Sequence, residues 1–227
     1  MDTTTAYDRT RLRMTAIARA LPEADGDREV PCCPAWTVRQ LLSHAVGVTA
    51  DIVGGNVEGA GSDPWTKQQV DDRDGRSIAE LCDEWDESGP KLAAALAGGL
   101  LPAQAVFDLV THEHDLRHAI DQPGAQGDEA VPIGLGFVVD VWPVVMAAYP
   151  IPPLRIVADE AELVAGEDPE VTLALTPFET LRALTGRRSL DQVRGYRWGL
   201  DPEPWMPAFT WGPFTPSPTD LVEPVSL

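Results

Sequence analysis

Three of the four histidines of this chain lie in one short stretch that begins at Asp108 and ends at His118. In an α-helix, residues four apart lie on the same face, one turn above each other. Asp108 and His112 have this spacing, and carboxylate and imidazole are ligands that zinc and related divalent metals take. The fourth histidine, His44, is the natural third ligand from another helix. The stretch therefore predicts a helical protein with a metal site between two helices.

Other residues of this stretch compete for the same role. The apolar residues that recur at helical spacing mark its buried face: Val106, Leu109, Val110, Leu116 and Ile120. At about 100° per residue, His112 lies beside this face, whereas His114 and His118 point to the opposite side and are expected to be exposed. Glu113 lies nearest the centre of the apolar face. Periodicity thus favours His112 and leaves Asp108 and Glu113 open as the acidic ligand, or Glu113 as a buried base.

Composition and charge narrow the class of protein. A formal net charge of −19 argues against nucleic acid and anionic membranes as partners, and a hydrophobic fraction of 44% is enough for a folded core. No secretory signal is visible in the first residues and no apolar run of about 18 residues occurs, so neither secretion nor a membrane span is expected. Three cysteines, Cys32, Cys33 and Cys82, cannot all pair with one another. A reducing, cytoplasmic location is the simplest expectation.

The order of the expected elements indicates an α+β protein with two domains. Helices are expected over 4–21, from residue 38 after the N-cap Thr37, from residue 78 with a kink or break at Gly89-Pro90, over 102–122, and over 133–148, the last being apolar all round and therefore central. Residues 54–76 are expected to form a long loop. After a proline-rich boundary at 149–153, strands are expected over 154–158 and 171–175, followed by two short helices and an extended, proline-rich tail. The expected domains are 1–150, a metal-binding helical bundle, and 151–227, a small α/β domain.

Three segments of the chain resemble the mycothiol-dependent maleylpyruvate isomerase family. Residues 36–44 read WTVRQLLSH, similar to the family segment whose final histidine binds metal. Residues 108–116 read DLVTHEHDL, similar to the segment that supplies a carboxylate and a second histidine. Residues 176–189, TPFETLRALTGRRS, resemble the small C-terminal domain of actinobacterial members. The chain departs from the isomerase in having aspartate rather than glutamate at Asp108 and an acidic residue at Glu113.

The resemblance implies a DinB-like four-helix bundle that binds a divalent metal, zinc first among them, through His44, Asp108 and His112. It also implies a low-molecular-weight thiol, mycothiol, as cosubstrate. Free thiols ionise near pH ~8.5, and coordination to a divalent metal deprotonates them, which supplies a nucleophile for isomerisation, conjugate addition or S-transfer to a small electrophile. Arg187 and Arg188 are candidates for binding that electrophile. A neutral or weakly polar electrophile suits the acidic chain better than an anionic one.

Two other functions fit the same residues. The bundle could be a catalytically silent binding or regulatory module, in which the acidic groups form ion pairs instead of holding a metal. It could also be a metal-dependent hydrolase that uses a bound water at the open coordination position. Neither the electrophile nor the oligomeric state follows from the sequence.

Overall fold

The computed structural model describes residues 1–99 and 104–224, which divide into two compact units. The first comprises Met1–Ala125 together with the C-terminal segment that starts at Glu223, and the second comprises Gln126–Val222. This division differs from the boundary expected at residue 150. The difference is the helix α6 (Ala130–Met146), which packs on the strand β4 (Ala161–Ala165) and on the helix α7 (Pro177–Leu184) and so lies in the second unit.

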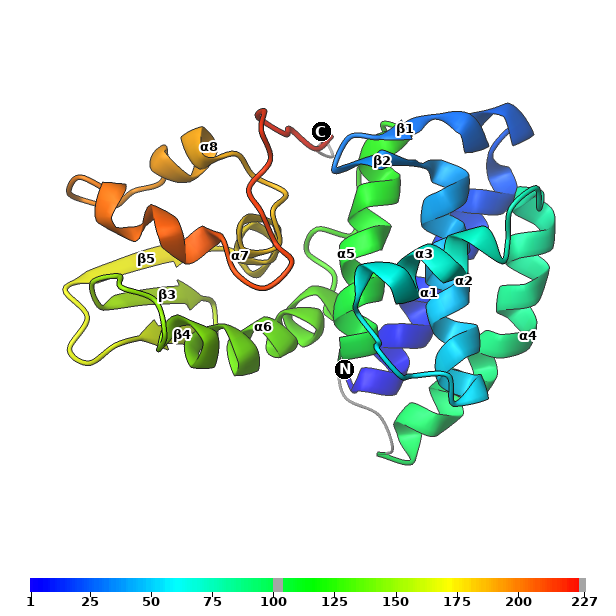
Figure 1. Ribbon diagram of the computed structural model, residues 1–227, viewed down its shortest axis with the longest axis horizontal. Coiled ribbons are helices and arrows are strands. Elements are labelled where there is room, and N and C mark those ends of the chain that lie inside the picture. The colour runs from blue at the N-terminus through cyan, green and yellow to red at the C-terminus, as the bar shows by residue number, and fades with distance from the viewer. Residues whose placement is uncertain (100–103, 225–227) are drawn as a thin grey trace. The chain divides into compact units, whose positions relative to one another are not determined.

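The first unit is a four-helix bundle, shown in Figure 1. Its helices are α1 (Thr3–Ala20), α2 (Val38–Gly54), α4 (Ile78–Ala97) and α5 (Gln104–Ala119). Each packs on two others, because α4 contacts α1 and α2, and α5 contacts the same two helices from the other side. The helical bundle of the predicted α+β fold is thereby confirmed. Residues 102 and 103 of the expected 102–122 helix lie outside the described residues.

Capping residues fix where several helices begin. Thr37 opens α2 and Ser77 opens α4, and each forms a capping box with the residue three positions later. The helix α4 continues through Gly89 and Pro90 instead of breaking there. A side chain on Gly89 would place its Cβ 2.3 Å from Arg11 Cδ, so glycine lets the Arg11 side chain pass against α4.

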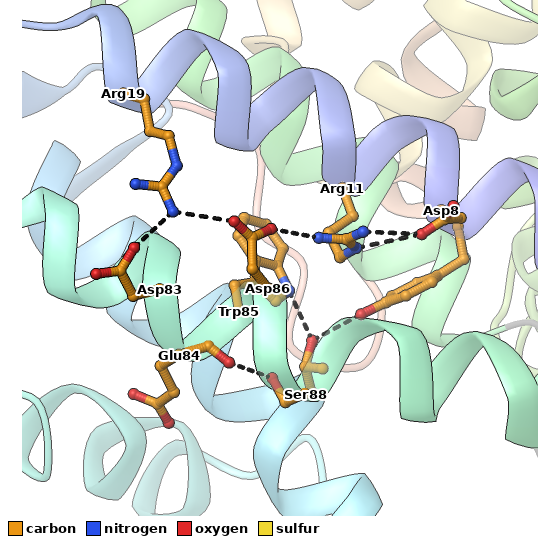
Figure 2. A network of polar contacts seen from close by, with 10 residues as sticks. Asp8, Arg11, Arg19, Asp83, Glu84, Trp85, Asp86 and Ser88 are labelled. Carbon is orange, nitrogen blue, oxygen red and sulfur yellow. Dashed lines mark hydrogen bonds and ion pairs between the residues drawn. The ribbon is translucent and has the colours of Figure 1, made fainter.

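A network of ion pairs joins α1 to α4 (Figure 2). Arg11, whose side chain is 5% exposed, pairs with Asp8 at 3.0 Å and with Asp86 at 2.9 Å. Arg19 pairs with Asp83 at 2.7 Å and with the second oxygen of Asp86 at 2.9 Å. The network fixes the register of the two helices, while exposed members such as Asp83 add little to stability.

The helix α5 is buried nearly all round, contrary to the expectation of one wet face. His114 is 2% exposed and His118 is half-buried, because α1, α2 and the strand β1 (Glu29–Val30) surround the helix. Conversely, α6 was expected to be central, yet Val144 on it is 73% exposed. The expectation that α6 is the central helix, which rested on its apolar content alone, is therefore wrong.

Several short elements of the first unit were not expected from the sequence. The 54–76 segment contains a helix, α3 (Asp63–Asp71), which packs on α2. A short antiparallel pair of strands, β1 and β2 (Cys33–Thr37), precedes α2, with a 3₁₀ helix η1 (Glu23–Asp27) before it. Both α3 and β2 carry residues that surround the candidate site.

The second unit contains a three-stranded sheet with the order β4-β3-β5. The strands β3 (Leu154–Ala158) and β5 (Val171–Leu175) lie where they were expected and run parallel, while β4 forms an antiparallel hairpin with β3. A short helix α8 (Leu190–Arg194) and a 3₁₀ helix η2 (Glu203–Phe209) follow α7, so part of the expected extended tail is helical. Among the described residues, no helix has the length and apolar character needed to cross a membrane.

Candidate metal centre

The structure brings His44, Asp108 and His112 together inside the bundle. Asp108 Oδ1 lies 3.5 Å from His44 Nε2 and 3.6 Å from His112 Nε2, and the three potential ligand atoms all lie within 4.8 Å of one another. Ligands held about 2.0–2.1 Å from a tetrahedral zinc would be about 3.4 Å apart. The spacing of these atoms therefore fits a small divalent cation with little rearrangement.

Each histidine ring is held by a hydrogen bond at its other nitrogen. Gln69 of α3 donates its amide to Asp51 at 2.8 Å, so its oxygen faces His44 Nδ1 at 2.8 Å and accepts from it. Asp115 Oδ2 lies 3.0 Å from His112 Nδ1 and accepts in the same way. Since both Nδ1 atoms donate, both Nε2 lone pairs face Asp108, which is the arrangement metal-binding histidines adopt.

The three residues differ in their access to solvent. The side chains of His44 and His112 are 5% and 9% exposed, whereas Asp108 is 28% exposed. The Trp36 ring lies against both imidazoles, with centroids 5.0 Å from His44 and 5.9 Å from His112. The group is thus enclosed by aromatic and helical walls and reaches solvent on the side of Asp108.

Glu113 faces away from this group. Its carboxylate accepts from Arg13 at 2.6 Å and from Arg117 at 3.0 Å, and its side chain is only 1% exposed. Glu113 thus forms a buried ion pair with two arginines, which neutralises it and ties α5 to α1. Of the two acidic candidates left open by periodicity, only Asp108 lies with the histidines.

The cysteines form two further groups near the start of β2. Cys33 Sγ donates to Asp115 Oδ2 at 3.7 Å and belongs with His112, so it adjoins the candidate centre. Cys32 Sγ lies 3.2 Å from His118 Nδ1, and Glu223 completes a separate group whose ligand atoms lie within 4.8 Å.

The helical bundle that carries these residues is similar to a known protein family. Residues 7–117 match the family model described as the mycothiol maleylpyruvate isomerase N-terminal domain. The chain carries this family's N-terminal domain. The resemblance found from the sequence motifs is confirmed for that part of the chain, and the matched range includes His44, Asp108 and His112.

Two solved structures extend the likeness across both units. A crystal structure of the mycothiol-dependent maleylpyruvate isomerase matches with a TM-score of 0.55 at 16% identity, covering 82% of this chain and 88% of that chain. A crystal structure of a histidine-to-alanine mutant of the mycothiol-dependent maleylpyruvate isomerase matches with a TM-score of 0.54 at 15% identity and the same coverage, 82% and 88%. At this level of sequence identity, the structural likeness shows a shared fold and no more. No curated protein sequence matches the chain.

Sequence reasoning missed Gln69, the residue that orients His44. The segment around it was expected to be a loop, although Ser62 followed by Pro64 is a helix-start signal, and Ser62 does cap α3. The role of Asp115 as the partner of His112 was also missed, although an acid three residues after a histidine lies within reach on a helix.

The candidate substrate arginines have partners within the second unit. Arg188 makes a two-pronged ion pair with Glu179, with two contacts of 2.7 Å, and Arg187 donates to the Thr185 carbonyl at 2.6 Å. Both side chains are buried. These contacts stabilise the turn between α7 and α8.

Proposed function

We propose that this chain is a metal-dependent enzyme that uses a low-molecular-weight thiol, mycothiol, to attack a small electrophile, with isomerisation or S-transfer as the outcome. The observation that carries the proposal is the convergence of His44 Nε2, Asp108 Oδ1 and His112 Nε2 at 3.5–3.6 Å, with both Nδ1 atoms held by acceptors. The family domain and the shared fold with a mycothiol-dependent isomerase support the same assignment.

The donor set fits a catalytic rather than a closed structural zinc. Three protein ligands leave one position open, as in hydrolytic and thiol-using zinc enzymes. Bound there, a divalent metal would lower the pKa of a coordinated thiol and make the thiolate available at neutral pH. Asp108 is the most exposed of the three side chains, so we infer that a thiol and an electrophile approach from its side.

The surrounding residues of this chain prepare the site. Gln69 and Asp115 hold the imidazoles in one tautomer and one orientation, which reduces reorganisation on binding. Trp36 shields one side of both rings from water. Asp51 and Asp115 add negative charge around the histidines, so we infer an electrophile that is neutral or weakly polar rather than an anion.

The first test is the metal content of protein purified without a polyhistidine tag. We expect Asp108→Ala and His112→Ala each to lose the metal of this centre, while the helical circular dichroism signal is retained, because the apolar core holds the bundle together. His114→Gln is the matched control, since His114 lies on the same helix but outside the group, and it should keep the metal. A metal content in both ligand variants that equals that of the natural protein would contradict the proposal.

The second test asks whether the centre accepts a thiol. Mycothiol or cysteine is added to the cobalt-substituted protein, and a thiol-dependent increase in thiolate-to-cobalt absorption in the near ultraviolet is expected, which His112→Ala should not show. If millimolar thiol leaves the spectrum unchanged while the metal is present, the thiol chemistry fails and a hydrolase that uses bound water becomes the better assignment. If no metal binds, the bundle is a binding or regulatory module.

A further inference from the structure

A second group of metal-ligand side chains lies apart from the candidate centre. Cys32 comes from the turn between β1 and β2, His118 from the last turn of α5, and Glu223 from the C-terminal segment that belongs to the same unit. None of these residues is shared with the group formed by His44, Asp108 and His112. Three segments that are distant in sequence thus meet at one point.

The chemistry of this group is that of a zinc ligand set. A thiolate, an imidazole and a carboxylate are all common zinc ligands, and the thiolate excludes magnesium and calcium as preferred occupants. Cys32 Sγ and His118 Nδ1 are 3.2 Å apart. In a tetrahedral site with zinc–sulfur about 2.3 Å and zinc–nitrogen about 2.0–2.1 Å, these atoms would be about 3.5 Å apart. A shift of a few tenths of an ångström would accommodate the ion.

Burial of the third member supports a built site rather than a chance surface cluster. Glu223 is 8% exposed, although only four residues follow it in the sequence. Cys32 and His118 are half-buried. A partly enclosed carboxylate, imidazole and thiol whose ligand atoms lie within 4.8 Å of one another form a donor set that zinc takes.

The neighbouring cysteine does not form an equivalent site. Cys33 Sγ donates to Asp115, which in turn holds His112 Nδ1. A metal bound by Cys33 and Asp115 would compete with the hydrogen bond that orients His112. The two adjacent cysteines therefore have different surroundings, and only Cys32 lies in an independent ligand set.

We propose that Cys32, His118 and Glu223 form a second divalent-metal site of the zinc class, which ties the C-terminal segment to the β1–β2 turn and to α5. The proposal does not depend on the thiol chemistry of the first centre. It requires that the untagged protein bind two equivalents of zinc.

Metal stoichiometry tests this directly, on the full chain kept reduced with a phosphine rather than a thiol. We expect two zinc equivalents in the natural protein and one in Cys32→Ser, His118→Gln and His112→Ala. The double variant Cys32→Ser/His112→Ala should bind none. Cys33→Ser and Cys82→Ser are matched controls and should keep two. If His112→Ala loses zinc but Cys32→Ser and His118→Gln do not, only the first centre exists and the second-site proposal is wrong.

Cobalt spectroscopy supplies a readout specific to the second site. With no thiol added, a thiolate-to-cobalt band can arise only from a cysteine of the protein, because the first centre has no sulfur ligand. The band should be present in His112→Ala and Cys33→Ser and absent from Cys32→Ser. One zinc equivalent in the natural protein, or a band that survives in Cys32→Ser or disappears in Cys33→Ser, would overturn the proposal.

Discussion

At the scale of single residues, the candidate centre depends on side chains that do not touch the metal position themselves. Gln69 accepts from His44 and is itself held by Asp51, so the orientation of the imidazole depends on a chain of two hydrogen bonds. Asp115, which is fully buried, orients His112 in the same way by accepting a hydrogen bond from its Nδ1. Ligands fixed in this way lose little entropy when the ion binds.

Removal of Gln69 should therefore weaken metal binding without removing a ligand. We expect Gln69→Ala to lower the zinc affinity by about 10–100-fold, the range seen for partners of ligating histidines. Competition against a chromogenic chelator measures this change. Gln68→Ala is the matched control, because Gln68 is exposed on the same helix and its side-chain amide donates to Asp72 and not to a histidine of the centre. Equal affinities in the two variants would show that Gln69 does not orient the ligand.

Cys82 should make stability fall at alkaline pH. Burial raises the pKa of this thiol from 9.0 to about 11, with Arg19 acting weakly in the opposite direction. Below pH 9 the thiol is neutral in both folded and unfolded states, whereas between pH 9 and 11 the unfolded chain ionises first and is stabilised. Urea unfolding at pH 8 and pH 10 should show a larger loss for the natural protein than for Cys82→Ala. Equal losses would mean that the folded thiol ionises freely.

The candidate ligands could be named from the sequence, but the residues that orient them, Gln69 and Asp115, could not. The helical pattern favoured His112, and the second apolar helix offered His44, while Asp108 was selected over Glu113 only by the family resemblance; the structure brings the three side chains together. The choice between Asp108 and Glu113 required knowledge of where Arg13 and Arg117 lie. Such pairing partners come from other elements, and local periodicity carries no information about them.

At the scale of elements, the close approach of α3 to α2 explains how Gln69 reaches His44. Gly47 lies on α2 where the two helices meet, and a Cβ there would come within 2.5 Å of Gln69 Cβ. That atom is at the root of the side chain, so rotation cannot relieve the clash and α3 has to move. The role of Gly47 could not be predicted from the sequence, because it depends on α3, a helix in a segment that was expected to be a loop.

Gly47→Ala should consequently disturb the centre from outside it. We expect a lower melting temperature together with weaker zinc binding, because displacement of α3 withdraws Gln69 from His44. Gly54→Ala on the same helix is the control, since nothing lies within 4 Å of its Cβ position. It should be neutral or slightly stabilising, as expected for alanine in a helix. Unchanged zinc binding in Gly47→Ala would show that α3 tolerates the extra methyl group.

Hydrophobic periodicity did not predict correctly which faces of α5 and α6 are buried. The helix α5 reads as amphipathic, yet polar residues on it are buried, among them Glu113 in its ion pair with two arginines and His112 in the candidate metal group. The helix α6 reads as a core helix but leaves Val144 exposed. Hydrophobic periodicity identifies apolar side chains that are expected to be buried. It does not identify polar side chains that are buried because they have hydrogen-bond or ion-pair partners.

At the scale of the whole molecule, all proposed metal ligands belong to the first unit. His44, Asp108, His112, Cys32, His118 and Glu223 lie there, while the sheet and α6 form the second unit. The α+β class was predictable from the sequence, because the helical patterns precede the strand patterns. The division after Ala125 was not, since it depends on which surface α6 covers.

We therefore expect the two units to respond differently to metal removal. Calorimetric unfolding should show two transitions, and a chelator should lower only the transition of the helical bundle, by the linkage between ligand binding and folding. The double variant Cys32→Ser/His112→Ala should show no chelator effect. A single transition that shifts as a whole would mean that the two units unfold together.

The position of Trp36 also makes the candidate centre optically visible. An indole whose ring lies 5.0 Å from one ligand histidine and 5.9 Å from the other is within contact range for quenching by a paramagnetic ion or by a protonated imidazole. Although the chain has seven tryptophans, the difference between the natural protein and Trp36→Phe isolates this fluorophore. Its emission would follow occupancy of the first centre in real time.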